Sequence, residues 1–392
     1  MRILLVIDRY SMFGIPNGGA SQRNTLFVKA LAQMGHVDVC SFSEEEIVSD
    51  IEDCDMLYSN PVPEEGNRFV KNAKQIIGIT ISPSNPYSYF NKNEKREKIV
   101  DELVKQGEYD IIACRYLHTA ISCGLLKYKD KLVLDLDDNP SNKLKSMARN
   151  DKSVLSKAKH LYMSKRIPLM VEKTLEEVFC SFYSNIIEPP SPKSVYLHNT
   201  IVNPICIPDI QPTASNRILF IGSLNYPPNK YGVYHFVSNV FPLIKKSVHN
   251  VEFLIVGSGK KSVLDELNNM GGGIKALGFV EDLAAEYKEA KVVAIPIYQG
   301  SGSCVKFVEG MFMNRTMVST PVGARDFDRF AKDGEHFLLA KNDEDFAEKI
   351  VELLLDTEKS NNIANNALAL AKTKFSEEQF MEIVKNAIRV PQ

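Results

Sequence analysis

The sequence has 392 residues, of which 44% are apolar and 24% charged, a balance typical of a globular protein with two or three domains. Its 47 lysines and arginines nearly match its 49 aspartates and glutamates, and the formal charge is −2. A dedicated nucleic-acid binder usually carries a clear basic excess, so we expect no nucleic-acid partner. The composition also excludes disordered and collagen-like classes.

The seven cysteines are spread along the chain and include no C-x-x-C pair. This pattern is typical of reduced thiols and disfavours a disulfide framework or a zinc site. The first apolar run, Ile3–Ile7, is too short for the core of a signal peptide, and no run approaches the ~20 residues that span a bilayer. We therefore expect a soluble, cytoplasmic protein.

The N-terminal half alternates expected strands with helical or polar stretches. Ile3–Ile7 is a continuous apolar run, as in a strand buried on both faces, and a turn-forming loop leads from it into a helix that Gly35 ends. Further strands are expected at Val37–Cys40, Asp55–Tyr58, Gln75–Ile81, Asp110–Cys114 and Lys131–Leu136. Such alternation predicts an α/β domain with a doubly wound parallel sheet.

A second α/β series follows a proline-rich connection between Glu188 and Asn216. Its expected strands are Arg217–Ile221, Glu252–Val256, Ile274–Leu277, Val292–Ile295 and Thr316–Ser319, with helices near 231–246, 261–270, 282–290, 304–313 and 343–372. We predict an N-terminal domain over residues 1–205, a linker over 206–216 and a C-terminal domain over 217–375. A last helix over 376–392 is a candidate to pack back on the first domain.

Ligands of open parallel sheets bind beyond the carboxyl ends of the strands, so the loops that leave those ends are the places to search. The first such loop holds Gly18 and Gly19 just ahead of a helix. Glycines at a helix N-terminus let backbone N–H groups approach a phosphate. A simple tight turn explains the same residues equally well.

The loop after the strand Val292–Ile295 is richer in chemistry. It contains Gly300, Ser301, Gly302 and Ser303 and opens a helix that carries Lys306 and Glu309 one turn apart. The loop offers backbone donors, the lysine adds charge for a diphosphate, and the carboxylate can accept hydrogen bonds from ribose hydroxyls. The alternative is an ordinary Lys–Glu pair on the surface of an amphipathic helix.

With this stretch the chain resembles the GT-B-fold glycosyltransferases, in particular glycosyltransferase family 4. The resemblance covers nearly the whole chain and is carried by an ordered set of short motifs. These are Gly18–Gly19, Phe220–Leu224 with Pro227–Asn229, Ile255–Gly259, Gly278–Asp282, Pro296–Glu309 and Val318–Gly323.

The resemblance implies a role for each donor-site residue. The amides of Gly18 and Gly19 and of Ser301–Ser303 would hold the diphosphate, Lys306 would neutralise it as it leaves, and Glu309 would hold the ribose. The backbone of Gly278, Phe279 and Val280 would contact the base, and Gly222 and Ser223 belong to the same donor site. Asp137 falls where many relatives place a histidine that touches the transferred sugar. The chain has Ser223 where relatives frequently carry an arginine, with Lys230 nearby, and it lacks a second glutamate before Glu309.

The resemblance further implies transfer of a sugar from a nucleotide diphosphate to a saccharide or lipid-linked acceptor, in cell-surface polysaccharide or glycoconjugate synthesis. Anomeric configuration would be retained, and neither a cofactor nor a metal would be required. The alternatives are a sugar-nucleotide epimerase of the same fold and a non-catalytic sugar-nucleotide or glycan-binding protein.

Three other features leave alternatives open. Asp135 and Asp137 could form the Asp-x-Asp metal site of single-domain glycosyltransferases, or cap the turn after a strand. His118 and His198 are more often hydrogen-bonding structural residues than catalytic ones. Residues 143–173 hold nine lysines and arginines against two acidic residues, interleaved with apolar ones. This segment suits either peripheral contact with the inner face of an anionic membrane or a solvated helix face.

Overall fold

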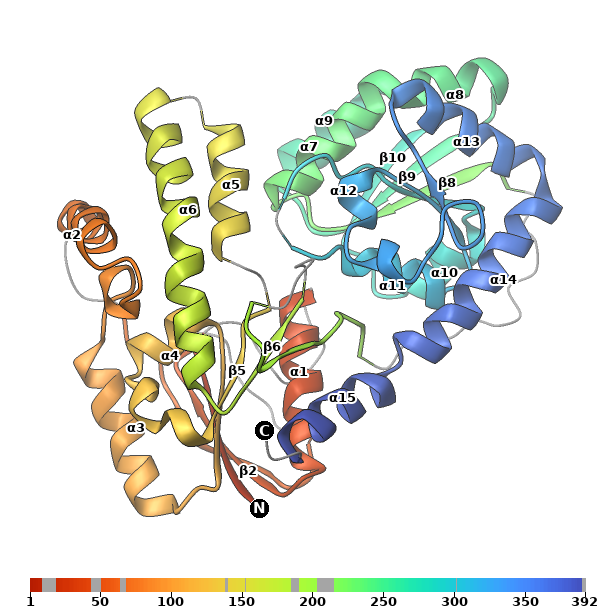
Figure 1. Ribbon diagram of the computed structural model, residues 1–392. Helices are drawn as coiled ribbons and strands as arrows, with labels where there is room; N and C mark the ends of the chain where they lie inside the picture. The colour runs from red at the N-terminus through yellow and green to blue at the C-terminus, as the bar shows by residue number, and fades with distance from the viewer. Residues whose placement is uncertain are drawn as a thin grey trace. The chain divides into compact units, whose positions relative to one another are not determined.

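The computed structural model describes residues 1–8, 19–43, 51–63, 68–137, 140–151, 153–184, 190–202, 215–300 and 302–389. The chain divides into two compact units (Figure 1). Unit 1 comprises Met1–Val202 together with Glu377–Gln392, and unit 2 comprises Asn203–Ser376. The C-terminal helix thus belongs to the same unit as the N-terminus.

Unit 1 is built on a parallel sheet, in which the described strands follow the order β3-β2-β1-β4-β5-β6-β7. The strands are β1 (Arg2–Ile7), β2 (His36–Ser41), β3 (Cys54–Ser59), β4 (Ile111–Arg115), β5 (Leu132–Asp135), β6 (Cys180–Tyr183) and β7 (Ser194–Tyr196). Side chains alternate along a strand, so both faces of β1 need cover. Ile3 and Leu5 pack with Leu26 of α1 on one face, whereas Leu4 and Val6 belong to a core on the other face. Burial on both faces explains the continuous apolar run.

The helices of unit 1 supply these two cores. They are α1 (Gly19–Ala32), α2 (Arg68–Ile81), α3 (Glu94–Gly107), α4 (Leu117–Ser122), α5 (Pro140–Asn150), α6 (Val154–Glu177) and α15 (Glu377–Arg389). Helix α15 packs beside α1, where Phe380 and Val384 join the core that covers Ile3 and Leu5 (Figure 1). Lys29 of α1 also pairs with Glu377 at 3.2 Å. The last helix therefore completes one face of this sheet.

Unit 2 repeats the same plan with a shorter sheet. Its described strands are parallel and follow the order β10-β9-β8-β11-β12-β13. They are β8 (Arg217–Ile221), β9 (Glu252–Val256), β10 (Ile274–Gly278), β11 (Val292–Ile295), β12 (Thr316–Ser319) and β13 (Leu338–Leu339). The helices are α7 (Pro227–His235), α8 (Phe241–Ser247), α9 (Lys261–Asn269), α10 (Leu283–Glu289), α11 (Val305–Phe312), α12 (Pro321–Ala324), α13 (Asp343–Leu355) and α14 (Thr357–Lys374). The predicted fold of two doubly wound α/β domains is confirmed.

Several expected elements are wrong in detail. Gln75–Ile81 is the end of helix α2 and not a strand, because its β-branched residues bury only one helical face: Ile79 is buried while Ile77 and Ile81 are exposed. The long helix expected at 343–372 is two helices that meet at Asp356, whose side chain accepts from the Lys359 N–H and caps the second. Strand β7 lies inside the proline-rich stretch between Glu188 and Asn216, where no strand was expected. No described helix is long and apolar enough to cross a membrane.

Candidate active site

In each sheet the order of the strands reverses at one point relative to the chain. Among the described strands this point lies between β8 and β11 in unit 2, and between β1 and β4 in unit 1. Loops that leave neighbouring strands at such a point turn away from each other and leave a crevice for a ligand. The loops after these four strands are therefore the places where binding residues are expected.

Lys306 lies at the reversal point of unit 2, on the first turn of α11. Its Nζ donates a hydrogen bond of 2.9 Å to Oδ1 of Asn229 and lies 5.4 Å from the centre of the Phe220 ring. Asn229 in turn donates from Nδ2 to the carbonyl of Ser223, at 3.0 Å. The hydrogen-bond acceptor of Lys306 is thus a neutral amide that is itself held by the loop after β8. This amide leaves the charge of Lys306 uncompensated, and the acidic group that acts on it is Glu309, one turn farther along α11.

The loops after β8 and β9 approach so closely that only glycine fits at two positions. Gly222 has φ 153°, and a Cβ there would lie 2.7 Å from Asn229 Nδ2 and 3.2 Å from Lys306 Cε. Gly257 has φ 139°, and a Cβ there would lie 2.4 Å from the Gly222 carbonyl oxygen. Ser258 Oγ donates to Ser223 Oγ at 2.8 Å across the two loops. The glycines therefore bring backbone directly beneath the Lys306 side chain.

An arginine that was not predicted from the sequence holds the loop after β11 in place. Arg325 donates from Nη2 to the carbonyls of Gly300 and Gly302, at 3.3 and 3.2 Å. Ser303 Oγ donates to Asp326 at 2.7 Å, and Asp326 adopts a positive φ of 78°. Strained backbone is common where a functional loop has to be held in place. Ser301 lies outside the described residues.

Lys230 is the alternative cation suggested by the sequence, but its side chain points toward Tyr234 of its own helix. Its side chain is exposed, and its Nζ lies 5.7 Å from the centre of the Tyr234 ring on the same helix. Arg325 supplies a second positive charge beside the loop of Gly300 and Gly302 instead. The signal for Arg325 in the sequence was its position shortly after the Thr320–Gly323 turn, at the carboxyl end of β12.

Glu309 lies one helical turn after Lys306 and is half-buried. Burial raises the pKa of Glu309 to about 7, although Lys306 and a hydrogen bond from Tyr287 act in the opposite direction. Tyr287 is fully buried, and burial together with the Glu309 carboxylate raises the pKa of its hydroxyl. The structure therefore brings Glu309 together with Lys306, and its carboxyl group titrates near neutral pH.

The three residues expected to contact a base lie at the end of β10, two strands from β8. Gly278 adopts φ 75° and accepts a hydrogen bond of 2.7 Å from the Gly257 N–H. Phe279 follows with 74% of its side chain exposed, and Val280 is half-buried. An exposed aromatic ring at this edge can stack on a base.

The reversal point of unit 1 gathers polar side chains of a different kind. Asp8 follows β1 and is buried; it accepts from Thr119 Oγ1 at 2.8 Å and lies 2.7 Å from His118 Nε2. The His118 ring stacks on Tyr116, which adopts φ 69° at the end of β4. Gly19 is the first residue of α1, and Gly18 lies outside the described residues. His118 is thus held between Asp8 and the Tyr116 ring, with 18% of its side chain exposed.

A buried network of two arginines and two aspartates lies next to this point. Arg23 contacts both carboxylate oxygens of Asp135, at 2.7 and 2.8 Å, and Arg115 Nε donates to Asp135 at 2.9 Å. Arg115 Nη2 also donates to Asp137 at 2.5 Å. Arg23 further donates to Asn199, at 2.9 Å. The charges of these four residues cancel within the unit.

Asp137 is therefore engaged by cations of the protein itself. Burial alone would raise the pKa of Asp137, but Arg115 and Arg23, with hydrogen bonds from Asn199 and Ser184, hold it below its ordinary value. The carboxylate stays ionised with 14% of the side chain exposed. Because arginines occupy the oxygens of Asp135 and Asp137, this pair is poorly suited to bind a metal cation. A direct role of Asp137 at the sugar stays a prediction.

The comparisons with known proteins agree with the geometry of unit 2. Residues 215–356 match the family model described as glycosyl transferases, group 1, and they include Lys306 and the loops around it. Over these residues the chain is similar to group 1 glycosyltransferases. The prediction of a GT-B-fold glycosyltransferase is thereby confirmed, and the strands that form the reversal point of unit 2 all lie within the matched residues.

Solved glycosyltransferases share the fold over the whole length of the chain. A glycosyltransferase from Rickettsia africae superimposes with a TM-score of 0.63 at 15% sequence identity. A sucrose-phosphate synthase from Thermosynechococcus elongatus superimposes with a TM-score of 0.67 at 14% sequence identity. Each of these two comparisons covers 99% of this chain and 98% of the other chain. The Anabaena protein Alr3699/HepE, solved with UDP and glucose, has a TM-score of 0.62 at 14% identity and 98% coverage of both chains.

A curated relative is an uncharacterized 44.6 kDa protein in the cps region of Klebsiella pneumoniae. It is 23% identical over 301 residues, which cover 72% of this chain and 76% of the relative.

Proposed function

We propose that this glycosyltransferase moves a sugar from a nucleotide diphosphate to a saccharide or lipid-linked acceptor, with retention of the anomeric configuration, in the synthesis of a cell-surface polysaccharide. The observation that carries the proposal is Lys306, a cation held by a neutral amide at the reversal point of a group 1 domain. The relative in a cps region and the neighbour solved with UDP and glucose support the pathway and the donor class.

The donor diphosphate gains negative charge as its bond to the sugar breaks. Lys306 would stabilise that charge, and Arg325, which holds the carbonyls of Gly300 and Gly302, would keep the amides of the same loop in position. Preorganised donors of this kind contribute most when they face the charge that develops in the transition state. The amides of Gly18 and Gly19, which the resemblance assigns to the diphosphate, would act as further donors. Glu309 would hold the ribose.

The reaction would need no metal ion. The oxygens of Asp135 and Asp137, the acidic pair that a metal would require, are taken by Arg23 and Arg115. Two guanidinium groups already neutralise the two carboxylates, so a divalent cation there would meet no net attraction. The diphosphate charge would be met by Lys306 alone among the side chains assigned to it.

Nucleotide-dependent stabilisation followed by turnover tests this function. A ligand that binds only the folded state raises its melting temperature, so a panel of UDP, GDP, dTDP and ADP should single out one base. The corresponding nucleotide sugars should then release the free nucleotide when an acceptor extract is added. Stabilisation without release in any combination would point to a non-catalytic binding protein. Release of a changed nucleotide sugar would point to an epimerase.

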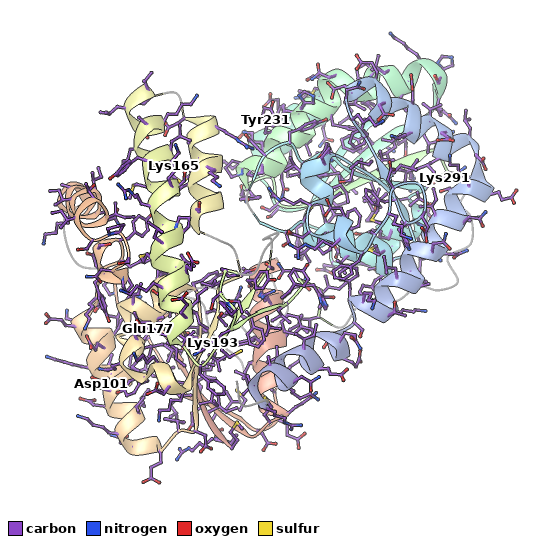
Figure 2. The ribbon with its side chains drawn as sticks, viewed as in Figure 1. Asp101, Lys165, Glu177, Lys193, Tyr231 and Lys291 are labelled. Carbon is purple, nitrogen blue, oxygen red and sulfur yellow. The ribbon has the colours of Figure 1, made fainter. Side chains whose placement is uncertain are left out.

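We propose further that helices α5 and α6 of unit 1 rest on an anionic membrane. Val154 and Leu155 at the start of α6 are 84% and 82% exposed, and Leu161, Tyr162 and Leu169 are exposed farther along. Exposed basic residues alternate with them, including Lys165 (Figure 2). Apolar side chains that enter the headgroup region beside lysines suit a bilayer with anionic lipids. The membrane that α5 and α6 contact would then also hold the lipid-linked acceptor.

Vesicle binding tests the membrane contact. The protein should bind anionic vesicles, and salt should release it, because each basic residue near the surface contributes roughly 1 kcal/mol. Replacing Lys157, Lys159, Lys165 and Arg166 with glutamine should abolish the binding. A matched control replaces Lys245, Lys246, Lys260 and Lys261 of unit 2 with glutamine and should keep it. Equal binding to neutral and anionic vesicles, or none to either, would return the segment to an ordinary solvated face.

A further inference from the structure

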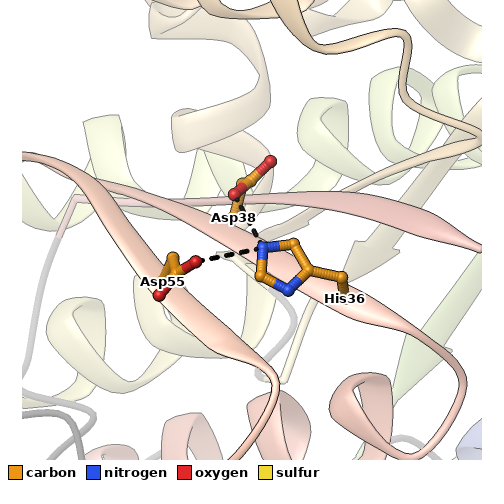
Figure 3. Close-up of side chains that lie close together, drawn as sticks. All are labelled: His36, Asp38 and Asp55. Carbon is orange, nitrogen blue, oxygen red and sulfur yellow. Dashed lines mark hydrogen bonds and ion pairs between the residues drawn. The ribbon is translucent and has the colours of Figure 1, made fainter.

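A histidine and two aspartates meet on the two outermost strands at the β3 side of the unit 1 sheet (Figure 3). His36 begins β2 and Asp38 follows two residues later, so their side chains leave the same face of the strand. Asp55, on the neighbouring strand β3, is the register partner of Asp38. The strands thus place three potential ligands side by side. His36 is at the amino-terminal end of its strand, whereas the candidate active site lies at the carboxyl ends.

The three ligand atoms have the spacing of a metal site. His36 Nε2 lies 3.2 Å from Asp38 Oδ1 and 3.3 Å from Asp55 Oδ2, and all three atoms lie within 4.8 Å of one another. Zinc bonds to nitrogen and oxygen are about 2.0–2.2 Å long, which separates the ligands of a tetrahedral ion by roughly 3.3–3.6 Å. We propose that His36, Asp38 and Asp55 bind a divalent transition-metal ion, with zinc as the preferred ion and water completing its coordination.

The surroundings of Asp38 prepare it as a ligand. Asp38 is buried, and its Oδ2 accepts from Arg2 at 2.9 and 3.0 Å, so its Oδ1 is the oxygen directed at His36. The Tyr109 hydroxyl also lies beside this carboxylate, and burial with the Asp38 contact raises the pKa of Tyr109. Hydrogen bonds of this kind orient metal-binding carboxylates in proteins.

The opposite side of the cluster is open. Asp55 is 71% exposed and His36 40% exposed, so an ion can enter from solvent and keep water ligands. With a neutral imidazole, the two carboxylates outweigh the one guanidinium and leave a net charge of −1 for a dication. A proton on His36 shared between the two carboxylates is the competing occupant. The experiment below separates the two.

The donor set selects the type of ion. Imidazole nitrogen suits zinc, nickel, copper and iron, whereas magnesium and calcium prefer sites made of oxygen alone. Since the ligands come from two strands, the ion would fasten β3, which ends the described sheet, to its neighbour β2. The role is therefore structural: it stabilises unit 1 and leaves sugar transfer at the other end of the strands unchanged.

Metal binding by the full-length protein tests the proposal. After dialysis against a chelator, calorimetric titration with Zn²⁺ should show one equivalent whose binding also raises the melting temperature. His36→Ala and Asp55→Asn should each weaken this binding more than tenfold, and Arg2→Met, which frees Asp38, by about 10–100-fold. Mg²⁺ should not bind at this site. His160→Ala is the matched control, because His160 pairs with the single carboxylate of Asp151 at 3.0 Å.

Failure of the parent protein to bind zinc would overturn the proposal and leave a protonated His36 between two aspartates. Zinc binding that survives in both His36→Ala and Asp55→Asn would overturn it as well, because the ion would then be held elsewhere, for instance by thiols. If His36→Ala does not fold, Asp55→Asn decides, because Asp55 is exposed and its removal leaves the Arg2–Asp38 pair intact.

Discussion

The two units share one plan of folding but differ in how they treat charge at the carboxyl ends of their strands. In unit 1, Arg23 and Arg115 are neutralised by Asp135 and Asp137 inside the protein. In unit 2, Lys306 donates to the neutral amide of Asn229. Cations that are already paired give rigidity, whereas a cation with a neutral partner remains available to an anionic ligand. The comparison indicates a structural role for the charged groups of unit 1, and it supports the proposal that Lys306 of unit 2 binds the diphosphate.

The largest expected effect concerns stability of unit 1. Arg23→Met leaves the buried Asp135 and Asp137 with one arginine between them, and breaking a buried charge network in this way typically costs about 3–5 kcal/mol. Arg217→Met in unit 2 is the control, because Arg217 pairs with Glu252 near the surface, where such pairs contribute about 0–1 kcal/mol. Urea unfolding followed by a probe in each unit measures both. Equal losses of unfolding free energy in the two variants would contradict the proposed difference between the units.

The next effect concerns nucleotide affinity in unit 2. Glu309→Ala should weaken binding of the preferred nucleotide by about 1.5–3 kcal/mol, the range for a hydrogen bond to a charged group. Glu344→Ala serves as the control, since Glu344 is exposed on the first turn of α13. Calorimetry with the folded variants gives the two affinities. A Glu309→Ala variant that binds the nucleotide like the parent would remove Glu309 from the ribose site.

A third effect is a pH dependence of stability that comes from the same residue. The folded-state pKa of Glu309 is raised to about 7 from an ordinary value of 4.5, so the folded protein binds the proton more tightly than the unfolded chain. The stabilisation is fully present below pH 4.5 and is lost as pH rises to about 7. Glu309→Gln, which is always neutral, should therefore be more stable than the parent at pH 8 and about equal to it at pH 4.5. Melting curves at the two pH values measure this, and a parallel shift at both would contradict the assignment.

Much of the framework could be predicted from local sequence. Continuous apolar runs such as Ile3–Ile7 and Val292–Ile295 indicate strands buried on both faces, and they are strands in the structure. The glycine loops and Lys306 could also be located, because they follow such strands directly. By contrast, β6 and β7 are too short for a periodic pattern, and Gln75–Ile81 has the β-branched composition of a strand but buries only one helical face.

The partners within the site could not be predicted in the same way. Arg23 meets Asp135 and Asn199, which lie 112 and 176 positions away along the chain, so only the folded sheet brings them together. A charged residue among apolar ones, such as Arg115 at the end of Ile111–Arg115, was the available signal for this network. The directions of Lys230 and Arg325 likewise depend on the helices and turns that carry them.

The most direct test of the central claim is the effect of Lys306→Ala on turnover with the preferred nucleotide sugar. The diphosphate is more negative in the transition state than in the bound donor, so a cation there should act mainly on kcat. We expect kcat to fall by ~10²-fold or more with a smaller change in donor KM. The exposed Lys230→Ala variant should behave like the parent, and EDTA should leave the parent rate unchanged. A Lys306→Ala variant that changed KM alone, or a parent enzyme inactivated by EDTA, would contradict the account.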